Sequence, residues 1–241
     1  NDELRDHKPV LLYWFMMSAY GVLGVNEFAA RFWSAALAIG TVLATYQMGR
    51  RLFGAEVGLW SGLILSTTLM FGVAARAATP DSVLIFFFTL SLLIYVLATF
   101  RPHAVGDGAG PQLRISGQFF PASWPAVALM YALMGMAVLA KGPAGLVLPT
   151  AVIGMFLLIM RLPERGEVQP AGQRRRPWLE WLRAALRPWA PLHFLRTCWS
   201  MRPLTALAVS LAVALPWYAW VGVRTDGEWL RGFFFTHNLE R

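Results

Sequence analysis

Long apolar runs separated by clusters of charge constrain this chain more than any other feature of its sequence. Apolar residues make up 57% of the chain and charged residues only 14%, and the charges gather at the ends of the runs. Each run has about 18–23 residues, enough for a helix to cross a hydrocarbon layer of about 30 Å. Backbone polar groups find no water in lipid, so helices are the expected spans. The predicted spans are residues 27–49, 56–76, 82–100, 124–141, 143–161 and 203–223.

The sequence therefore predicts an all-α, polytopic membrane helix bundle with about six transmembrane helices plus interfacial amphipathic helices. Residues 1–241 are expected to form a single partial membrane domain, because the chain begins at Asn1 without an initiator methionine and stops in a polar segment. The single cysteine, Cys198, excludes an intrachain disulfide framework and a multi-cysteine metal site. We assign the net charge of +8 to lipid headgroups and membrane orientation, and we expect no nucleic-acid partner.

Basic residues predict the orientation of the bundle. The segments around residues 50–51, 101–114 and 161–202 carry an excess of arginine, whereas acidic and basic residues balance on the opposite side. The positive-inside rule places the arginine-rich side in the cytoplasm. Both termini, residues 76–81 and the Lys-Gly-Pro turn at 141–143 then lie outside. The expected location is a bacterial inner (plasma) membrane, with a periplasmic active face.

Four segments between the spans have their own expected roles. Residues 10–24 are too short to cross and are interpreted as a helix in the outer interface. Residues 101–123 are rich in Gly and Pro and are interpreted as an exposed loop. Residues 162–202 form a cytoplasmic basic loop with an amphipathic segment that suits an anionic leaflet. Residues 224–241 form an outer loop with interleaved aromatic side chains.

Three charged residues at the predicted outer helix ends are candidates for chemistry. Lys8 either binds a lipid phosphate or only extends its ammonium group to water. Asp81 follows Thr79 and Pro80, the expected cap and first residue of a helix, where the helix dipole favours a carboxylate. It either orients a substrate or only stabilises the helix. Lys141 interrupts a long uncharged stretch at a Gly-Pro turn, and the turn residues do not explain a lysine there.

Two further residues complete the candidate set. Arg76 lies five positions before Asp81 and is a candidate ligand for a lipid phosphate. His237 lies in the C-terminal aromatic segment, where a structural role competes with phosphate, hydrogen-bonding or metal binding. If a divalent metal ion binds, His7, Asp81 and His237 are its candidate ligands; no other cofactor is expected.

Several short motifs then follow one another along the chain. They are His7-Lys8-Pro9 with Leu12-Tyr13-Trp14, residues 24–31, residues 49–54, Arg76 to Asp81, residues 141–146, Leu215-Pro216-Trp217-Tyr218, and residues 234–241. In this order they resemble the lipid-linked-sugar glycosyltransferases, the group of aminoarabinose transferases and dolichyl-phosphate-mannose protein mannosyltransferases with the C-type glycosyltransferase fold.

This resemblance implies an enzyme of the membrane. It implies inverting, nucleotide-independent transfer of a sugar from a polyprenyl-phosphate donor to a lipid or protein acceptor, outside the cytoplasm. The family's Lys-Pro lysine, which contacts the carrier phosphate, matches Lys8. The acidic residue of its second outer loop matches Asp81, and its Lys-Gly-Pro lysine matches Lys141.

The chain also departs from the family pattern. The family's main catalytic Asp belongs to an Asp-Glu motif that we expect upstream of Asn1, so the fragment alone is expected to be inactive. His7 replaces the family's usual Glu. Two other classes stay open: a transporter, which would favour ionisable groups near the bilayer midplane, and a non-catalytic membrane scaffold.

Overall fold

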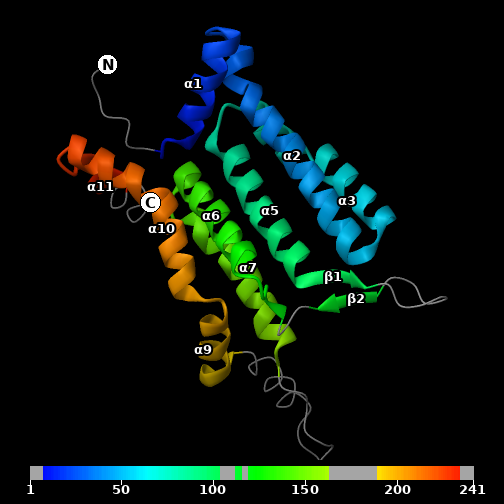
Figure 1. The fold of residues 1–241 in the computed structure, drawn as a ribbon. Coiled ribbons are helices and arrows are strands. Elements are labelled where there is room, and N and C mark those ends of the chain that lie inside the picture. Colours follow the sequence, from blue (N-terminus) through cyan, green and yellow to red (C-terminus); the bar gives the residue numbers. More distant parts are fainter. Residues whose placement is uncertain (1–7, 104–111, 116–118, 163–188, 234–241) are drawn as a thin grey trace, which may run out of the picture.

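The computed structural model describes residues 8–103, 112–115, 119–162 and 189–233. In these ranges the chain forms a bundle of apolar helices with one short hairpin (Figure 1). The elements are α1 (Leu11–Leu23), α2 (Glu27–Phe53), α3 (Ala55–Thr67), α4 (Leu69–Arg76), α5 (Pro80–Thr99), β1 (Phe100–His103), β2 (Gln112–Ile115), α6 (Trp124–Lys141), α7 (Ala144–Met160), α9 (Pro191–Ser200), α10 (Pro203–Arg224) and α11 (Glu228–Arg231).

Helices α5 and α6 form the centre of the bundle. Helix α5 packs against α2, α6 and α7, and α6 also packs against α7 and α10. In the most apolar stretch of α5 more than half of the residues are buried. In the corresponding stretch of α10 only 17% are buried. The apolar surface of α10 is therefore largely left to lipid or to other protein, as expected for an outer helix of a membrane bundle.

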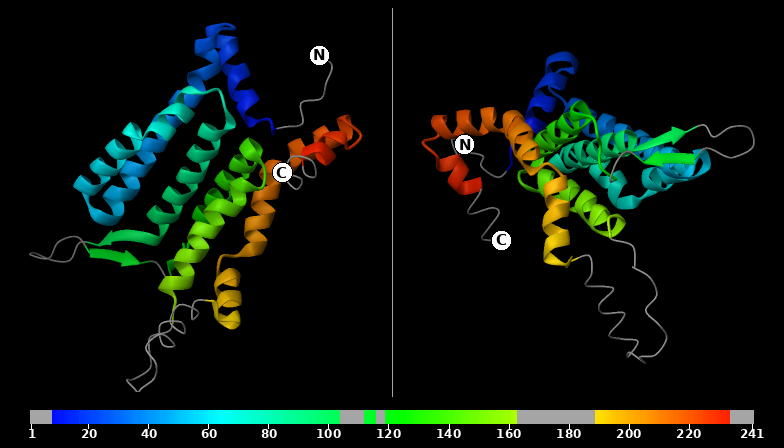
Figure 2. Two further views of the ribbon diagram at one scale, coloured as in Figure 1. Left: turned by 180° about the vertical axis from the view of Figure 1, so that it is seen from behind. Right: turned by 60° about the horizontal axis from the view of Figure 1, so that its bottom comes forward.

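The bundle has two distinct ends, and both views in Figure 2 separate them. We call one the α11 end: it holds the starts of α1, α5 and α7, the ends of α6 and α10, and α11 itself. We call the other the α9 end: it holds the α2–α3 turn, the hairpin and α9. Each end has its own buried cluster, one around Val83 and Ala140, the other around Met130 and Leu157.

The helices occupy the six apolar runs, but not all as single straight spans. In the described ranges, four helices are long and apolar enough to cross a membrane: α2, α5, α6 and α10. Helix α7, with 17 residues, is slightly shorter than these four. The run expected at 56–76 is divided into α3 and α4, bent by 66°, and counts as a fifth span only if the pair is taken together.

Hydroxyl side chains explain why this run bends. Ser66 and Thr67 donate hydrogen bonds to the Leu63 carbonyl, at 2.8 and 3.0 Å, and Thr68 donates to the Ile64 carbonyl at 2.8 Å. Ser and Thr hydroxyls that bond back to the preceding turn compete with the helical ladder and bend helices. Thr68 itself has extended backbone angles, so α3 ends there and α4 starts in a new direction.

The hairpin is the element that the sequence did not predict. Residues 101–123 were expected to form a loop, but β1 and β2 pair antiparallel with Phe100 opposite Ile115. The Phe100 ring lies edge-on to Tyr95 and Phe156, and the Phe100 carbonyl accepts a 2.7 Å hydrogen bond from Arg51 Nε. These contacts fix the first strand to the helices, which a loop composition does not reveal.

Asn26 and Gly24 set the boundary between α1 and α2. Asn26 caps α2 by accepting a 2.8 Å hydrogen bond from the Ala29 amide. Helix α1 ends at Gly24, whose positive φ of 76° suits a residue without a Cβ. The chain therefore makes a sharp turn between α1 and α2 (Figure 1).

Helices α6 and α7 approach so closely at Gly145 that there is no space for a side chain. A Cβ at this position would overlap the backbone of Ala137 and Val138. Gly154, nine residues further along the same helix, has space: its Cβ would lie 3.5 Å from the Met201 sulfur.

We predict that Gly145→Ala lowers the free energy of unfolding of the detergent-solubilised protein by about 1–3 kcal/mol, because the two helices must move apart. Gly154→Ala is the matched control and should be nearly neutral. Thermal unfolding followed by circular dichroism measures both variants. Equal stability of the two would contradict the close α6–α7 contact.

Candidate functional site

The Lys141-Gly142-Pro143 turn forms one half of the candidate site. Helix α6 ends at Lys141, and Gly142 follows with φ of 77° and donates a 2.7 Å hydrogen bond to the Val138 carbonyl. Gly supplies the positive φ, and Pro143 fixes the chain direction into α7. The lysine is therefore carried by the last residue of a well-packed helix rather than by a loose loop.

The start of α5 forms the other half. Thr79 stands at the cap position with extended backbone angles, although its side chain makes no capping hydrogen bond, and Pro80 is the first helical residue. Asp81 lies in the first turn, as predicted. The N-terminal end of a helix carries partial positive charge, which stabilises an ionised carboxylate there.

These two halves meet in an ion pair. Lys141 Nζ donates a hydrogen bond to Asp81 Oδ1, although the residues are 60 positions apart in the chain. Both side chains keep part of their surface, with 35% of Lys141 and 42% of Asp81 exposed. Two residues that the sequence singled out separately are thus brought together, and both remain within reach of a ligand.

Lys8 and Arg76 lie at the same end of the bundle but outside this pair. Lys8 precedes the fully buried Pro9 and helix α1, whose Leu11 and Leu12 belong to the buried cluster at the α11 end. Arg76 is the last residue of α4. Neither side chain forms a hydrogen bond or ion pair with another described residue.

The remaining candidates bear on metal binding. His7 and His237 lie outside the described residues. Within the described ranges, no group of three or more His, Cys, Asp or Glu side chains is close enough to hold a metal ion. Asp81 is the one candidate ligand that the structure places, and its partner there is a lysine ammonium.

An aromatic cluster behind the turn was not anticipated from the sequence. The tail was expected to lie against the outer surface, but Trp229 and Phe233 are only 4% and 2% exposed. Their rings stack 4.9 Å apart, and both contact Tyr218 of α10. A Cβ on Gly142 would lie only 2.6 Å from Cζ of the Phe233 ring. The absence of a side chain at Gly142 thus admits the ring and explains the burial.

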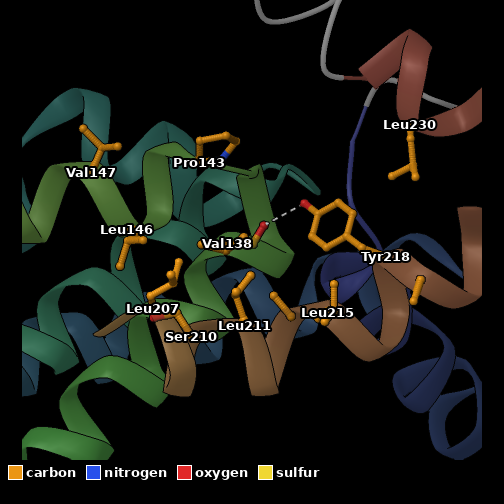
Figure 3. A pocket seen from close by; sticks show the side chains of 12 residues that line it. Val138, Pro143, Leu146, Val147, Leu207, Ser210, Leu211, Leu215, Tyr218 and Leu230 are labelled. Carbon is orange, nitrogen blue, oxygen red and sulfur yellow. Dashed lines mark hydrogen bonds between the residues drawn. The ribbon is translucent and has the colours of Figure 1, made fainter. Parts of the chain in front are cut away.

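An apolar groove runs between α6, α7 and α10, and Leu230 of α11 also lines it (Figure 3). Its volume is about 440 Å³. Its lining residues are Val138, Pro143, Leu146, Val147, Leu207, Ser210, Leu211, Ala214, Leu215, Tyr218, Ala219 and Leu230. The two hydroxyls in this set are bonded to α6: Ser210 donates to the Tyr131 carbonyl at 3.1 Å and Tyr218 to the Val138 carbonyl at 3.4 Å.

The groove adjoins the turn that carries Lys141. Val138 lies one helical turn before the lysine and Pro143 two residues after it, and both line the groove. Sequence reasoning missed the groove because its walls come from three helices far apart in the chain. The one available signal was the Leu215-Pro216-Trp217-Tyr218 motif, of which Leu215 and Tyr218 line the groove.

We predict that Gly142→Ala lowers the free energy of unfolding by about 1–3 kcal/mol more than Gly24→Ala. Both glycines end a helix with nearly equal positive φ, but a Cβ on Gly24 meets nothing closer than 4.0 Å, whereas one on Gly142 meets the Phe233 ring. The double variant Gly142→Ala/Phe233→Leu should regain part of the loss. Thermal unfolding measures all three, and equal losses for the two single variants would rule out the proposed contact.

Comparisons with known proteins agree with this architecture. Residues 7–104 match the sequence model of a family described as dolichyl-phosphate-mannose-protein mannosyltransferase. Two uncharacterized proteins of Aquifex aeolicus (strain VF5) are 36% and 30% identical to the chain, over 68% and 67% of its length. The chain spans only 29% and 32% of the length of these relatives.

The fold is also found in solved structures. The crystal structure of ArnT from Cupriavidus metallidurans bound to undecaprenyl phosphate matches 98% of this chain with a TM-score of 0.66 and 24% identity. The apo ArnT structure matches 95% with a TM-score of 0.63. The chain covers 35% and 34% of those ArnT chains.

The predicted fold class, a polytopic membrane helix bundle, is thereby confirmed, and so is the resemblance inferred from the motifs. At this identity, the ArnT match establishes architecture rather than activity. Residues 7–104 match the sequence model of the dolichyl-phosphate-mannose-protein mannosyltransferase family, and the described residues share the fold of the corresponding part of ArnT.

Proposed function

We propose that this chain is part of a membrane glycosyltransferase that moves a sugar from a polyprenyl-phosphate donor to a lipid or protein acceptor, with inversion and without a nucleotide. The observation that carries the proposal is the Asp81–Lys141 ion pair, formed by two helix ends next to an apolar groove. A donor of this class has a charged phosphate and a long apolar tail. The α11 end offers a partner for each.

The charges support a division of roles. The Lys141 ammonium would stabilise the negative charge that grows on the departing lipid phosphate. Asp81 would orient the acceptor hydroxyl or accept its proton while the acceptor oxygen attacks the sugar. Lys8, which forms no ion pair with a described residue, is a second candidate for the phosphate, as is Arg76. The active face would be the α11 end, and the excess of arginine at the opposite end supports a position outside the cytoplasm of a bacterial inner membrane.

The position of the pair favours this function over transport. Asp81 lies in the first turn of α5, and Lys141 is the last residue of α6. Transporters bind their ions and substrates near the bilayer midplane, often at broken helices. A charge pair at the helix ends instead suits a reaction at the membrane surface. A scaffold without catalytic function would leave the half-exposed pair without a role.

Removing either member of the pair should abolish most of the activity. We predict that Asp81→Asn and Lys141→Met each reduce sugar transfer by the full-length protein by about 100-fold or more, as for other catalytic acid–base and charge-stabilising groups. The assay follows transfer from a radiolabelled polyprenyl-phosphate sugar in proteoliposomes. The control is Arg31→Gln, which removes the exposed Arg31–Glu27 pair of 3.7 Å and should leave transfer unchanged. Near-normal transfer by both site variants would refute the assignment.

The groove makes a second prediction possible. Ala219→Trp places a large ring in the groove, whereas Ala212→Trp adds the same ring to an exposed position of α10 that does not line it. Displacing about two methylene groups of a lipid tail corresponds to about a tenfold loss of affinity. We expect Ala219→Trp to raise the KM for an undecaprenyl donor about tenfold but to leave that for a two-isoprene donor unchanged. An equal effect of both variants on both donors would exclude the groove as the site of the tail.

A further inference from the structure

Helix α9 has an inner face that fixes it to the end of α7. His193 Nε2 lies 2.9 Å from the Leu158 carbonyl, and Arg161 Nη1 donates a hydrogen bond to Ser200 Oγ. Between them, Thr197 is buried at 3% exposure. These residues follow one another at intervals of three and four, which is the spacing of one helix face. The orientation of α9 is therefore set by the bundle.

The opposite face of α9 is apolar and uncovered. Leu192, Leu195 and Trp199 are 71%, 63% and 71% exposed, and their spacing places them on one face. Trp189 stacks on Phe194 at 6.3 Å at the start of the same segment, and both rings are also exposed. In the described part of the chain, no element packs over this face.

Charge at the α9 end identifies what suits this face. Arg196 is exposed on α9 itself, and Arg202 directly precedes α10. Arg50 and Arg51 lie in the last turn of α2, at the same end of the bundle. Among the described side chains of this end, Glu56 is the single acidic one. An apolar stripe flanked by arginines complements anionic phospholipid, with the acyl boundary against the stripe and the phosphates against the guanidinium groups.

The dimensions exclude a membrane-crossing role. Ten residues give a helix of about 15 Å, about half of the hydrocarbon thickness. Arg202 has a positive φ of 53°, so the chain turns between α9 and α10. The exposed apolar surface then continues along α10 through Leu204 and Leu207, which are 71% and 54% exposed. One apolar surface thus runs from a candidate span onto α9, as it would at the border of a bilayer.

We propose that α9 is a membrane-surface helix that lies in the interface of the arginine-rich leaflet and recognises anionic phospholipid through Arg196. Leu192, Leu195 and Trp199 enter the headgroup–acyl boundary, and the inner face holds the end of α7 at this depth. The proposal narrows the amphipathic region expected within 178–199 to the described helix at Pro191–Ser200. It does not depend on the proposed glycosyl transfer.

Cys198, an exposed residue of α9 and the single cysteine of the chain, provides the probe. A nitroxide label at Cys198 would report membrane depth in the full-length protein, with any other cysteine replaced, in nanodiscs of phosphatidylcholine and phosphatidylglycerol. Labels at Ala55→Cys, at the start of α3, and Ala212→Cys, at an exposed position of α10 outside the groove, are the water and lipid controls in a Cys198→Ser background. Collision rates with oxygen and with a nickel chelate place each label.

We expect the label at Cys198 at about 5–10 Å below the phosphates, between the two controls. Two results would overturn the proposal. Collision with nickel as free as at position 55 would place α9 in water, and protection from both oxygen and nickel would mean that protein covers the face.

A second measurement tests the role of Arg196. The measured quantity is the preference of the helix for phosphatidylglycerol over phosphatidylcholine, given by the share of labels at interfacial depth in each lipid. We expect Arg196→Gln to reduce this preference about fivefold, because one surface cation is lost. Arg31→Gln, in the second turn of α2 and remote from α9, is the matched control and should leave the preference unchanged. An unchanged preference in Arg196→Gln, or an equal loss in both variants, would exclude Arg196 as the lipid-recognising group.

Discussion

The absence of water inside a lipid layer is the constraint on which this structure depends. A backbone or side-chain polar group in that layer must find its partner within the protein. Several hydroxyls meet this requirement locally: Thr41 donates to the Leu37 carbonyl, Ser91 to the Phe88 carbonyl and Thr150 to the Leu146 carbonyl. Full charges cannot be satisfied in this way. They are instead found at helix ends, and so the chemistry of the molecule is concentrated at its two ends.

The two ends use their charges differently. At the α11 end, an acid from the start of α5 meets a base from the end of α6, and the resulting pair is partly exposed. At the α9 end, arginines predominate and bond to neutral groups, such as the Phe100 carbonyl and the Ser200 hydroxyl. An ion pair between two rigid helix ends positions its groups without loop rearrangement. An excess of one charge, by contrast, suits attraction to a surface.

The sequence predicted the elements that depend on local signals. Pro80 as a first helical residue and the Gly142 turn each follow from the chemistry of one or two side chains. Asp81 was predicted as a carboxylate in the first turn of a helix, and Lys141 as a charge that its apolar context does not explain. Their mutual contact was not predicted, because it joins positions 60 residues apart. The same limit applies to the groove and to the burial of Phe233. Both depend on which helices become neighbours. Apolar runs of similar composition do not indicate which pairs of helices pack together.

The bend at Thr68 and the hairpin show a second limit. Hydropathy averages over a window, so a cluster of three hydroxyl residues at the end of an apolar run changes it little, although it redirects the helix. A four-residue strand fixed by one aromatic ring is likewise too short for a periodic signal. Features of this size depend on individual hydrogen bonds and ring contacts, which only the folded arrangement supplies.

The hydroxyls of Ser210 and Tyr218 both donate to α6 carbonyls, so the groove wall presents hydrocarbon to an occupant. Dispersion and hydrophobic contact act without direction and respond to length and girth rather than to functional groups. Molecules that share a tail are therefore equivalent to this wall. Discrimination among molecules with the same tail therefore has to take place at the polar groups beside the groove. A single substitution there would alter selectivity but leave the binding of apolar tails unchanged.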